Sequence, residues 1–424
     1  MLPHQVAFDT AAPAWEAIPT EAGVFALYGD DPQAEPYISR TPNLRRRMRR
    51  LLDARPDQTK RLRLAGAVTR IEYALTGSDF ESLLRLYAAS WAAFGERARK
   101  RLHLRPPALL RMTVENAYPR VYVTNKVTRS GMDELYGPFP SRASAEKFCE
   151  DMLDLFKLRR CYEDLAPDPA FPGCVYSEMK KCLAPCFKGC TDERYAEESA
   201  AVRAFLRTRG ASLVEALRKE RDAASELMEF EKAAELHNRL AKAEQVADEA
   251  PEAIRPLAHL DGVIVQPAAE ADHVALFRLA QGMLRGPVFY SVAGMRHPNE
   301  AAGSSSLYPQ PVARMEGVPL EAPVVTAASR DELEQRLEGV LAELDPPPEK
   351  RPLRLRTPRA ADLADHLCLF SRWYYRPQVK RVGEVVFADE DGAIPPKTLL
   401  RAISRVYRQG PSDRNPQRAP GSGA

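Results

Sequence analysis

The sequence predicts an α+β protein built from several domains. Its 424 residues are too many for one core, since domains usually hold about 100 to 200 residues. Short runs of alternating apolar and polar residues, typical of strands, occur between segments with helical spacing. With 45% hydrophobic and 28% charged residues, the composition is that of a globular chain.

Residues 1–105 are expected to form the first domain, a small α/β unit. Strands are predicted at 23–28, 36–39 and 68–75. Thr41 followed by Pro42 predicts a helix start, with Thr41 as the N-cap. Ser78 and Glu81 have the spacing of a capping box that opens a second helix.

Basic residues are concentrated in the first domain. Residues 40–70 contain eleven Lys and Arg against two acidic residues. The first helix is expected to bury an apolar stripe and to turn its arginines mostly toward solvent. These arginines are Arg45, Arg46, Arg49 and Arg50. Such an excess is typical of a phosphate-binding surface, although a solvated basic helix would explain the segment alone equally well.

Five of the seven cysteines lie between residues 161 and 190. Four of them follow the spacing C-x12-C-x7-C-x3-C, namely Cys161, Cys174, Cys182 and Cys186. Disulfides are a poor explanation, because the number of cysteines is odd and the start of the chain does not look secretory. Four thiolates on a loop-rich segment are typical of zinc or an iron–sulfur cluster, and the spacing alone leaves both open.

Residues 106–210, which include these cysteines, resemble the UvrC family of the excinuclease ABC system, which carries out bacterial nucleotide excision repair. The resemblance rests on the cysteine spacing and on two runs, Tyr136-Gly137-Pro138-Phe139-Pro140-Ser141 and Leu158-Arg159-Arg160-Cys161. In that family the corresponding cysteines hold a 4Fe–4S cluster. The resemblance therefore implies this cofactor, with zinc as the alternative.

The first domain resembles a GIY-YIG nuclease module, the N-terminal part of UvrC. Residues 23–25 and 37–39, followed by the Arg-rich helix, have the order of its two motifs. Such a module cleaves a phosphodiester with the help of a divalent metal. The resemblance implies catalytic roles for Tyr37, Arg40 and Arg47, and a need for Mg²⁺ only if the site is active.

Four positions depart from the nuclease pattern. Phe25 and Leu51 replace tyrosines, Ser39 replaces a glycine, and Leu86 stands where the metal-binding carboxylate is expected. A leucine offers no oxygen to a hard cation. We expect a degenerate nuclease domain that still binds DNA. The alternative is an active endonuclease that makes one incision, with another carboxylate, such as Asp79 or Glu81, holding the metal.

Residues 211–250 are expected to form a helical hairpin. The segment 227–240 resembles the UVR motif, through which the family pairs with the helicase subunit UvrB. An apolar seam for this partner is expected to consist of Phe230, Ala233, Leu236 and Leu240. An ordinary amphipathic hairpin that packs on its own domain has the same spacing.

Residues 251–408 are expected to form a divergent α/β domain, and 409–424 a disordered tail. Strands are predicted at 260–266, 274–279, 288–292 and 383–387, and helices at 329–344 and 361–375. A cluster of aromatic and basic residues around Trp373 and Arg376 suits either stacking on bases or packing at a helix end. We do not expect the ribonuclease-H-like or helix-hairpin-helix domains of full-length UvrC in this sequence.

No apolar run in the sequence is long enough to span a bilayer, and the first twenty residues lack the features of a signal peptide. The expected place of this protein is therefore the cytoplasm. Its expected partners are DNA and UvrB.

Overall fold

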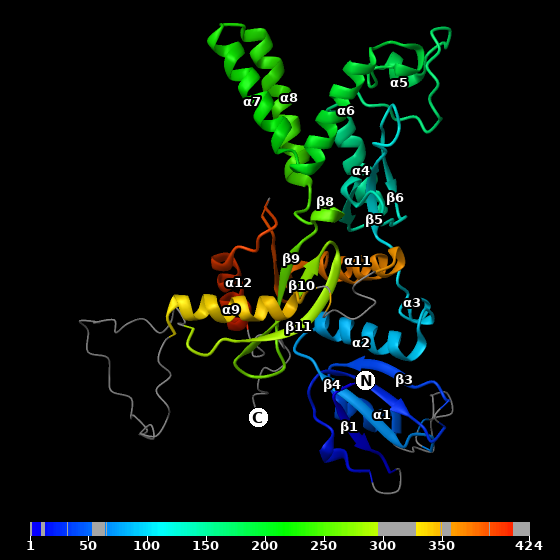
Figure 1. Ribbon diagram of the computed structural model, residues 1–424, viewed down its shortest axis with the longest axis vertical. Coiled ribbons are helices and arrows are strands. Elements are labelled where there is room, and N and C mark those ends of the chain that lie inside the picture. The colour runs from blue at the N-terminus through cyan, green and yellow to red at the C-terminus, as the bar shows by residue number, and fades with distance from the viewer. Residues whose placement is uncertain are drawn as a thin grey trace, which may run out of the picture.

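The computed structural model describes residues 2–9, 13–31, 33–52, 64, 66–295, 328–347, 349, 358–389 and 391–409. Figure 1 shows an elongated molecule, with the N-terminal domain at one end and the C-terminal domain in the middle. The hairpin of α7 (Ala211–Glu226) and α8 (Phe230–Glu249) forms the other end together with the segment that contains α5 (Val175–Glu178). The described residues form three four-stranded sheets in addition to the helices. The predicted mixture of helices and strands is therefore confirmed. The expected tail falls almost wholly outside the described residues.

The N-terminal sheet has the strand order β1-β4-β2-β3, with every neighbouring pair antiparallel. Its strands are β1 (His4–Ala7), β2 (Gly23–Tyr28), β3 (Tyr37–Thr41) and β4 (Arg70–Leu75). All three strands predicted in this region are therefore present. β2 is central and buried, and its strand neighbours fix the positions of the nuclease-like motifs.

Two helices cover opposite faces of this sheet. The helix α1 (Leu44–Leu52) packs Leu44, Met48 and Leu52 against Phe25 and Leu27 of β2. On the other face, α2 (Asp79–Phe94) contributes Phe80, Leu83 and Tyr87 to a core shared with the C-terminal domain. A short helix, α3 (Arg97–Arg101), follows α2.

The predicted start of α1 was wrong by two residues. Thr41 ends β3, and Asn43 caps the helix by accepting a hydrogen bond from the backbone N–H of Arg46 at 2.8 Å. Thr41 instead accepts from the N–H of Asn43 at 3.2 Å. Pairing of Gly23 with Thr41 extends β3, and this tertiary contact displaces the local preference for a helix.

The middle sheet has the order β6-β5-β7-β8. Its strands are β5 (Ala108–Met112), β6 (Val121–Thr124), β7 (Leu135–Phe139) and β8 (Arg255–Pro256). The helices around it are α4 (Arg142–Leu153), α5 (Val175–Glu178), α6 (Asp192–Arg207) and the hairpin α7–α8. One hydrophobic core runs from Ala108 through Val202 and Leu240 to Ile254. The hairpin therefore shares its core with the cysteine-bearing region.

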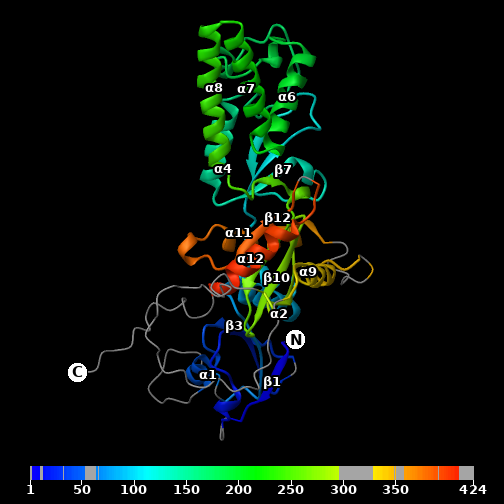
Figure 2. The ribbon, with the colours of Figure 1, turned by 90° about the vertical axis from the view of Figure 1, so that its left-hand side faces the viewer.

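The C-terminal sheet has the order β11-β10-β9-β12. Its strands are β9 (Gly262–Pro267), β10 (His273–Ala280), β11 (Met283–Ser291) and β12 (Glu384–Phe387). The helices α9 (Arg330–Leu344) and α12 (Pro396–Arg408) pack on one face, whereas α11 (Ala360–Tyr374) packs on the other together with α2. Figure 2 shows these helices around the sheet in the middle of the molecule. The helix α12 was not predicted from the sequence.

A buried ion-pair network connects the first and last domains. Arg99 donates to Asp365 at 2.8 Å and to Asp362 at 3.0 Å, and Tyr87 donates its hydroxyl to Asp365 at 3.0 Å. Both carboxylates are almost fully buried, so the guanidinium compensates charge that would otherwise be costly to desolvate. This network holds α3 and α2 against α11.

Candidate nucleic-acid interface and thiolate site

Tyr37 and Arg47 lie together on the α1 face of the N-terminal sheet. Arg47 reaches the Tyr37 hydroxyl from α1, with Nη2 at 3.5 Å from the oxygen. Phe25 is fully buried beside them, and its ring centroid is 6.1 Å from that of Tyr37. Ser39 pairs with Phe25 across the two strands. This face therefore presents the hydroxyls of Tyr37, Ser39 and Tyr73 beside the guanidinium of Arg47, while Phe25 at its centre has no hydroxyl.

Arg40 lies on the opposite face of the sheet. Side chains alternate along a strand, and Arg40 is one residue out of phase with Ser39 and three with Tyr37. Its guanidinium donates to the backbone carbonyl of Asp79 at 3.3 Å and lies 3.6 Å from the Asp79 carboxylate. The three predicted catalytic residues are therefore divided between two faces.

Neither alternative carboxylate contacts Tyr37 or Arg47 in the part of the chain that the structure describes. Asp79 is paired with Arg40 and with Arg376, the latter at 2.9 Å. Glu81 is 1% exposed, accepts from the Gly77 N–H at 2.9 Å and pairs with Arg85 at 2.8 Å. Glu81 therefore has the structural role of a capping residue at the start of α2.

The two leucines at departing positions are both half-buried. Leu51 belongs to α1 and packs beside the core under the N-terminal sheet. Leu86 lies in α2, on the side of the sheet that Arg40 faces. Their side chains contribute packing and provide no polar group for catalysis or metal binding.

The four α1 arginines that were predicted to bind DNA differ in their surroundings. Arg45 was expected to face solvent, but it donates to the Ile18 carbonyl at 2.7 Å and pairs with Glu16 at 3.0 Å. Arg49 lies 3.9 Å from Glu16. Arg46 and Arg50 are exposed, and no described carboxylate pairs with either. Two of the four predicted DNA-binding charges are thus unneutralised, whereas Arg45 fastens the helix to the preceding segment.

The four predicted ligand cysteines are all half-buried and lie on the chain segment that joins α4 to α6. The thiols of Cys161, Cys174 and Cys186 are all close enough to Cys182 to affect its charge. Burial, opposed by the Ala184 N–H and reinforced by these three thiols, raises the pKa of Cys182 to about 11. The four thiols thus influence one another electrostatically, and their role as metal ligands stays a prediction.

The surroundings of these thiols suit negatively charged sulfur. The Ala184 N–H donates to the Cys182 sulfur at 3.3 Å, and the buried guanidinium of Arg159 lies 3.7 Å from the Cys161 sulfur. Hydrogen bonds of this kind stabilise metal-bound thiolates. Arg159 was not predicted as a functional residue, although its position two residues before Cys161 was a usable signal.

The donor set fits an iron–sulfur cluster or zinc, since both accept four thiolates. Among the described residues, however, no three His, Cys, Asp or Glu side chains already form a closed metal-binding group. Cys190 is a fifth thiol in this segment, and burial, reinforced by the Asp192 carboxylate, raises its pKa. The choice of metal, and its presence, therefore remain expectations from the sequence.

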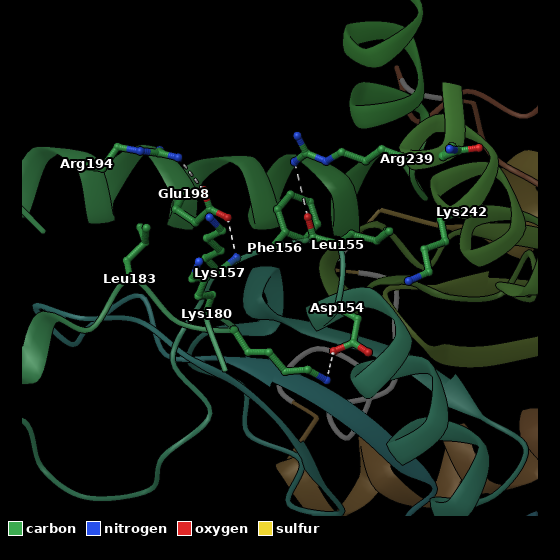
Figure 3. Close-up of a pocket in the computed structure, with 12 residues that line it drawn as sticks. Asp154, Leu155, Phe156, Lys157, Lys180, Leu183, Arg194, Glu198, Arg239 and Lys242 are labelled. Carbon is green, nitrogen blue, oxygen red and sulfur yellow. Dashed lines mark hydrogen bonds and ion pairs between the residues drawn. The ribbon is translucent and has the colours of Figure 1, made fainter. Parts of the chain in front are cut away.

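A basic cleft of about 1060 Å³ lies between the cysteine loop, α6 and α8. Figure 3 shows its lining, with Arg194 and Arg239 extending from helices and Lys180 from the loop. Six basic residues line the cleft, namely Lys157, Lys180, Lys181, Arg194, Arg239 and Lys242. Asp154 pairs with Lys181 at 2.9 Å and Glu198 pairs with Arg194 at 3.0 Å, and these are the only carboxylates among the described residues of this lining.

The remaining charge in the cleft is available to a ligand. Lys157, Lys180 and Lys242 are exposed, and no described carboxylate pairs with their ammonium groups. The walls are held in place because the Leu183 N–H donates to the Lys157 carbonyl at 3.0 Å, and the Lys157 N–H donates to Glu198 at 2.6 Å. A fixed, positive cleft is suited to an extended anionic ligand. Sequence reasoning missed it, because its lysines come from separate segments.

The predicted apolar seam of the hairpin is mostly internal. Leu236 and Leu240 are buried in the core between α7, α8 and α4, and Ala233 packs partly against it. Phe230 is 70% exposed and lies at the tip of the hairpin, beside exposed Leu227 and Met228. This corrects the expectation that all four seam residues face a partner. The free apolar surface is at the tip.

Two family models match the middle of the chain. Residues 108–205 match the model described as UvrC/Cho excinuclease, middle domain, and residues 211–246 match the UvrB/uvrC motif. The chain is UvrC-like in both regions. The resemblance read from the cysteine block and from the hairpin is therefore confirmed.

Curated relatives carry the name UvrABC system protein C. The protein from Moorella thermoacetica is 28% identical over 280 residues, which are 65% of this chain and 43% of the relative. Those from Desulforudis audaxviator and Nitratidesulfovibrio vulgaris are each 31% identical, over 54% and 65% of this chain and 36% and 38% of the relatives. The chain thus spans less than half the length of these relatives.

The similarity to UvrC is not confined to residues 1–250. The alignments with the Moorella thermoacetica and Carboxydothermus hydrogenoformans proteins cover 65% and 68% of this chain. Both shares are larger than the part of the chain that residues 1–250 make up. The alignments therefore extend into the C-terminal region, which the sequence alone suggested was at best a distant relation. No solved structure matches the chain. Among the described residues, no helix is both long and apolar enough to cross a membrane.

Proposed function

We propose that this protein is a UvrC-like accessory subunit of nucleotide excision repair, which binds DNA and the helicase subunit UvrB and does not incise DNA. The observation that carries the proposal is the division of the nuclease-like residues. Tyr37 and Arg47 lie on one face of the sheet, while Arg40 and Asp79 pair on the other. A metal-assisted hydrolysis needs a cation, an activated water and a metal-holding carboxylate in one place.

DNA binding is supported by the basic cleft and by the α1 helix. The three unpaired lysines of the cleft and the exposed Arg46 and Arg50 are suited to contact phosphates. Such contacts are strong at low salt and independent of base sequence. The protein would therefore recognise DNA mainly through its backbone.

Binding to UvrB is supported by the motif match over residues 211–246 and by the exposed tip of the hairpin. Leu227, Met228 and Phe230 form an apolar patch that no described residue covers. An exposed aromatic residue at the end of a rigid hairpin is a suitable anchor for a pocket on a partner.

A 4Fe–4S cluster held by Cys161, Cys174, Cys182 and Cys186 belongs to the same proposal, with zinc as the alternative. The bound group would cross-link a loop in which large apolar side chains such as Tyr162, Phe171 and Met179 are exposed and do not form a core. Arg159 and the Ala184 N–H would stabilise the thiolates. The role proposed for the cluster is structural.

The deciding experiment is a cleavage and binding assay on damaged duplex DNA with Mg²⁺ or Mn²⁺, with and without UvrB. The full chain is purified without oxygen, and its absorption spectrum is recorded. The proposal expects a UvrB-dependent DNA complex and no strand cleavage by this protein alone. Cleavage that disappears in Arg47→Ala would establish instead the single-incision endonuclease, with Tyr37, Arg47 and Mg²⁺ at the site.

A further inference from the structure

A second polar pocket lies between the N-terminal and C-terminal domains, on the face of the sheet opposite to Tyr37 and Arg47. It has a volume of about 650 Å³. Its lining combines the start of α2, the end of β3, the end of β9 and the segment after α11. Its exposed side, the mouth, is basic, and its buried side, the closed end, contains an amide and two aromatic rings. Each side is suited to a different part of a ligand.

Three basic side chains line the mouth. They are Arg40 from β3, and Arg376 and Lys380 from the segment after α11. Asp79 is the one carboxylate among the described lining residues, and it pairs with both arginines, at 3.6 and 2.9 Å. Because Asp79 is 64% exposed, these ion pairs are weakened by water and are open to exchange. The mouth therefore keeps a net positive charge around a replaceable carboxylate.

The closed end contains a buried amide. Gln266 is fully buried in β9, and neither its Nε2 nor its Oε1 has a hydrogen-bond partner among the described residues. A buried polar group without a partner destabilises the fold, typically by more than one hydrogen bond stabilises it. The presence of such a group at this position therefore indicates that a ligand or an ordered water bonds to it. The nearly buried rings of Phe80 and Trp373 lie 5.0 Å apart in the same lining.

The two domains are held closely enough to fix this arrangement. A Cβ at Gly77 would collide with the Pro267 carbonyl oxygen, so only glycine allows the loop before α2 to contact the end of β9. The pocket thus exists only in the assembled fold.

We propose that this pocket binds a nucleotide, either free or within a DNA strand. Its phosphate replaces the Asp79 carboxylate between Arg40, Arg376 and Lys380, and its base lies toward Gln266. The volume is much larger than one phosphate needs and is in the range of small-molecule sites. Arginine forks suit phosphate oxygens, and a Gln amide can bond a base edge. The site is separate from the basic cleft and does not depend on the accessory role proposed above.

The test is a calorimetric titration of the full chain with dAMP, with a single-stranded hexadeoxynucleotide and with inorganic phosphate. We expect dAMP to bind more tightly than phosphate. Arg376→Ala and Lys380→Ala should each weaken dAMP roughly tenfold, because each removes a charge-assisted contact. Asp79→Asn should strengthen it, since the competing carboxylate is lost. Arg142→Ala, which breaks an exposed pair on α4, is the matched control and should change nothing.

Gln266→Leu separates a ligand-binding role from a structural one. Removing an unsatisfied buried amide should raise the melting temperature, while dAMP affinity falls and phosphate affinity stays the same. Tighter binding of the hexanucleotide than of dAMP would assign the pocket's ligand to DNA if Arg376→Ala removes the difference, because Arg376 lines this pocket and not the basic cleft. Hexanucleotide binding that Arg376→Ala leaves unchanged, together with weakened dAMP binding, would assign the pocket to a free nucleotide. The proposal is overturned if dAMP binds no better than phosphate, or if Arg376→Ala and Asp79→Asn shift its affinity in the same direction.

Discussion

The guanidinium of Arg40 pairs with the carboxylate of Asp79 on one face of the N-terminal sheet. In the nuclease pattern, a cation at this position belongs with the tyrosine and arginine that lie on the other face. The polar side chains of β3 therefore lie on two faces of the sheet, Tyr37 on one and Arg40 on the other. Arg40 lines a pocket that the N-terminal domain shares with the C-terminal domain.

Strand cleavage should be absent when the purified protein alone is incubated with nicked or damaged duplex and Mg²⁺ or Mn²⁺. The physical reason is that no described carboxylate contacts Tyr37 or Arg47, so the described residues offer a metal no carboxylate ligand beside them. Gel analysis of end-labelled DNA measures this, and Arg47→Ala should behave as the wild type. A product present with the wild type and missing with Arg47→Ala would contradict the prediction.

The double variant Lys180→Glu, Lys242→Glu should bind duplex DNA more weakly and with a shallower salt dependence. Each phosphate contact that is lost lowers the slope of log K against log salt by about 0.9. Fluorescence anisotropy at several salt concentrations measures both quantities. The double variant Lys126→Glu, Lys219→Glu is the matched control, because both lysines are exposed but do not line the cleft. An equal loss in both variants would argue for a diffuse charge effect.

Phe230→Ala and Leu240→Ala should have opposite consequences. Phe230 is 70% exposed, so its loss should leave the unfolding free energy nearly unchanged and remove UvrB binding. Leu240 is 3% exposed in the core, and its truncation should cost about 2 to 4 kcal/mol of stability. Denaturant unfolding and a pull-down with UvrB distinguish the two. If Phe230→Ala still binds UvrB, the tip of the hairpin is not part of the interface.

Cys182→Ser should abolish metal binding, whereas Cys190→Ser should retain it. Burial and the other three predicted ligands raise the pKa of the Cys182 thiol, while Cys190 lies just before the N-cap of α6 and outside the predicted set. Metal analysis together with the visible spectrum of anaerobically purified protein gives the identity and amount of bound iron or zinc. Protease digestion should then cut the loop around Cys174 more readily in Cys182→Ser, since the cross-link is lost. Full metal content in Cys182→Ser would exclude the proposed ligand set.

Arg99→Ala should destabilise the protein by about 3 kcal/mol, because two buried carboxylates lose their shared guanidinium. The loss should appear as a lower unfolding midpoint in denaturant. Arg142→Ala is the control, since exposed ion pairs contribute less than about 1 kcal/mol. Similar midpoints for both variants would show that the network contributes little to holding α3 against α11.

Local patterns in the sequence were enough for much of the fold. The strand at Gly23–Tyr28 and the capped helices at Ser78 and Ser329 follow from alternation and from side-chain capping. The spacing of the four cysteines and the hairpin motif led to the UvrC-like assignment, which the family models confirm. These features depend on residues close together in the chain.

Only the tertiary structure decided which of these residues act together. The face toward which Arg40 points depends on the strand register of β3 and on Asp79 in the helix α2. The burial of Leu236 and Leu240 depends on the core that the hairpin shares with α4. The basic cleft and the pocket at Gln266 collect side chains from segments far apart in the sequence. Periodicity specifies which face of an element is apolar, but the neighbour that covers that face is chosen by packing across the whole chain.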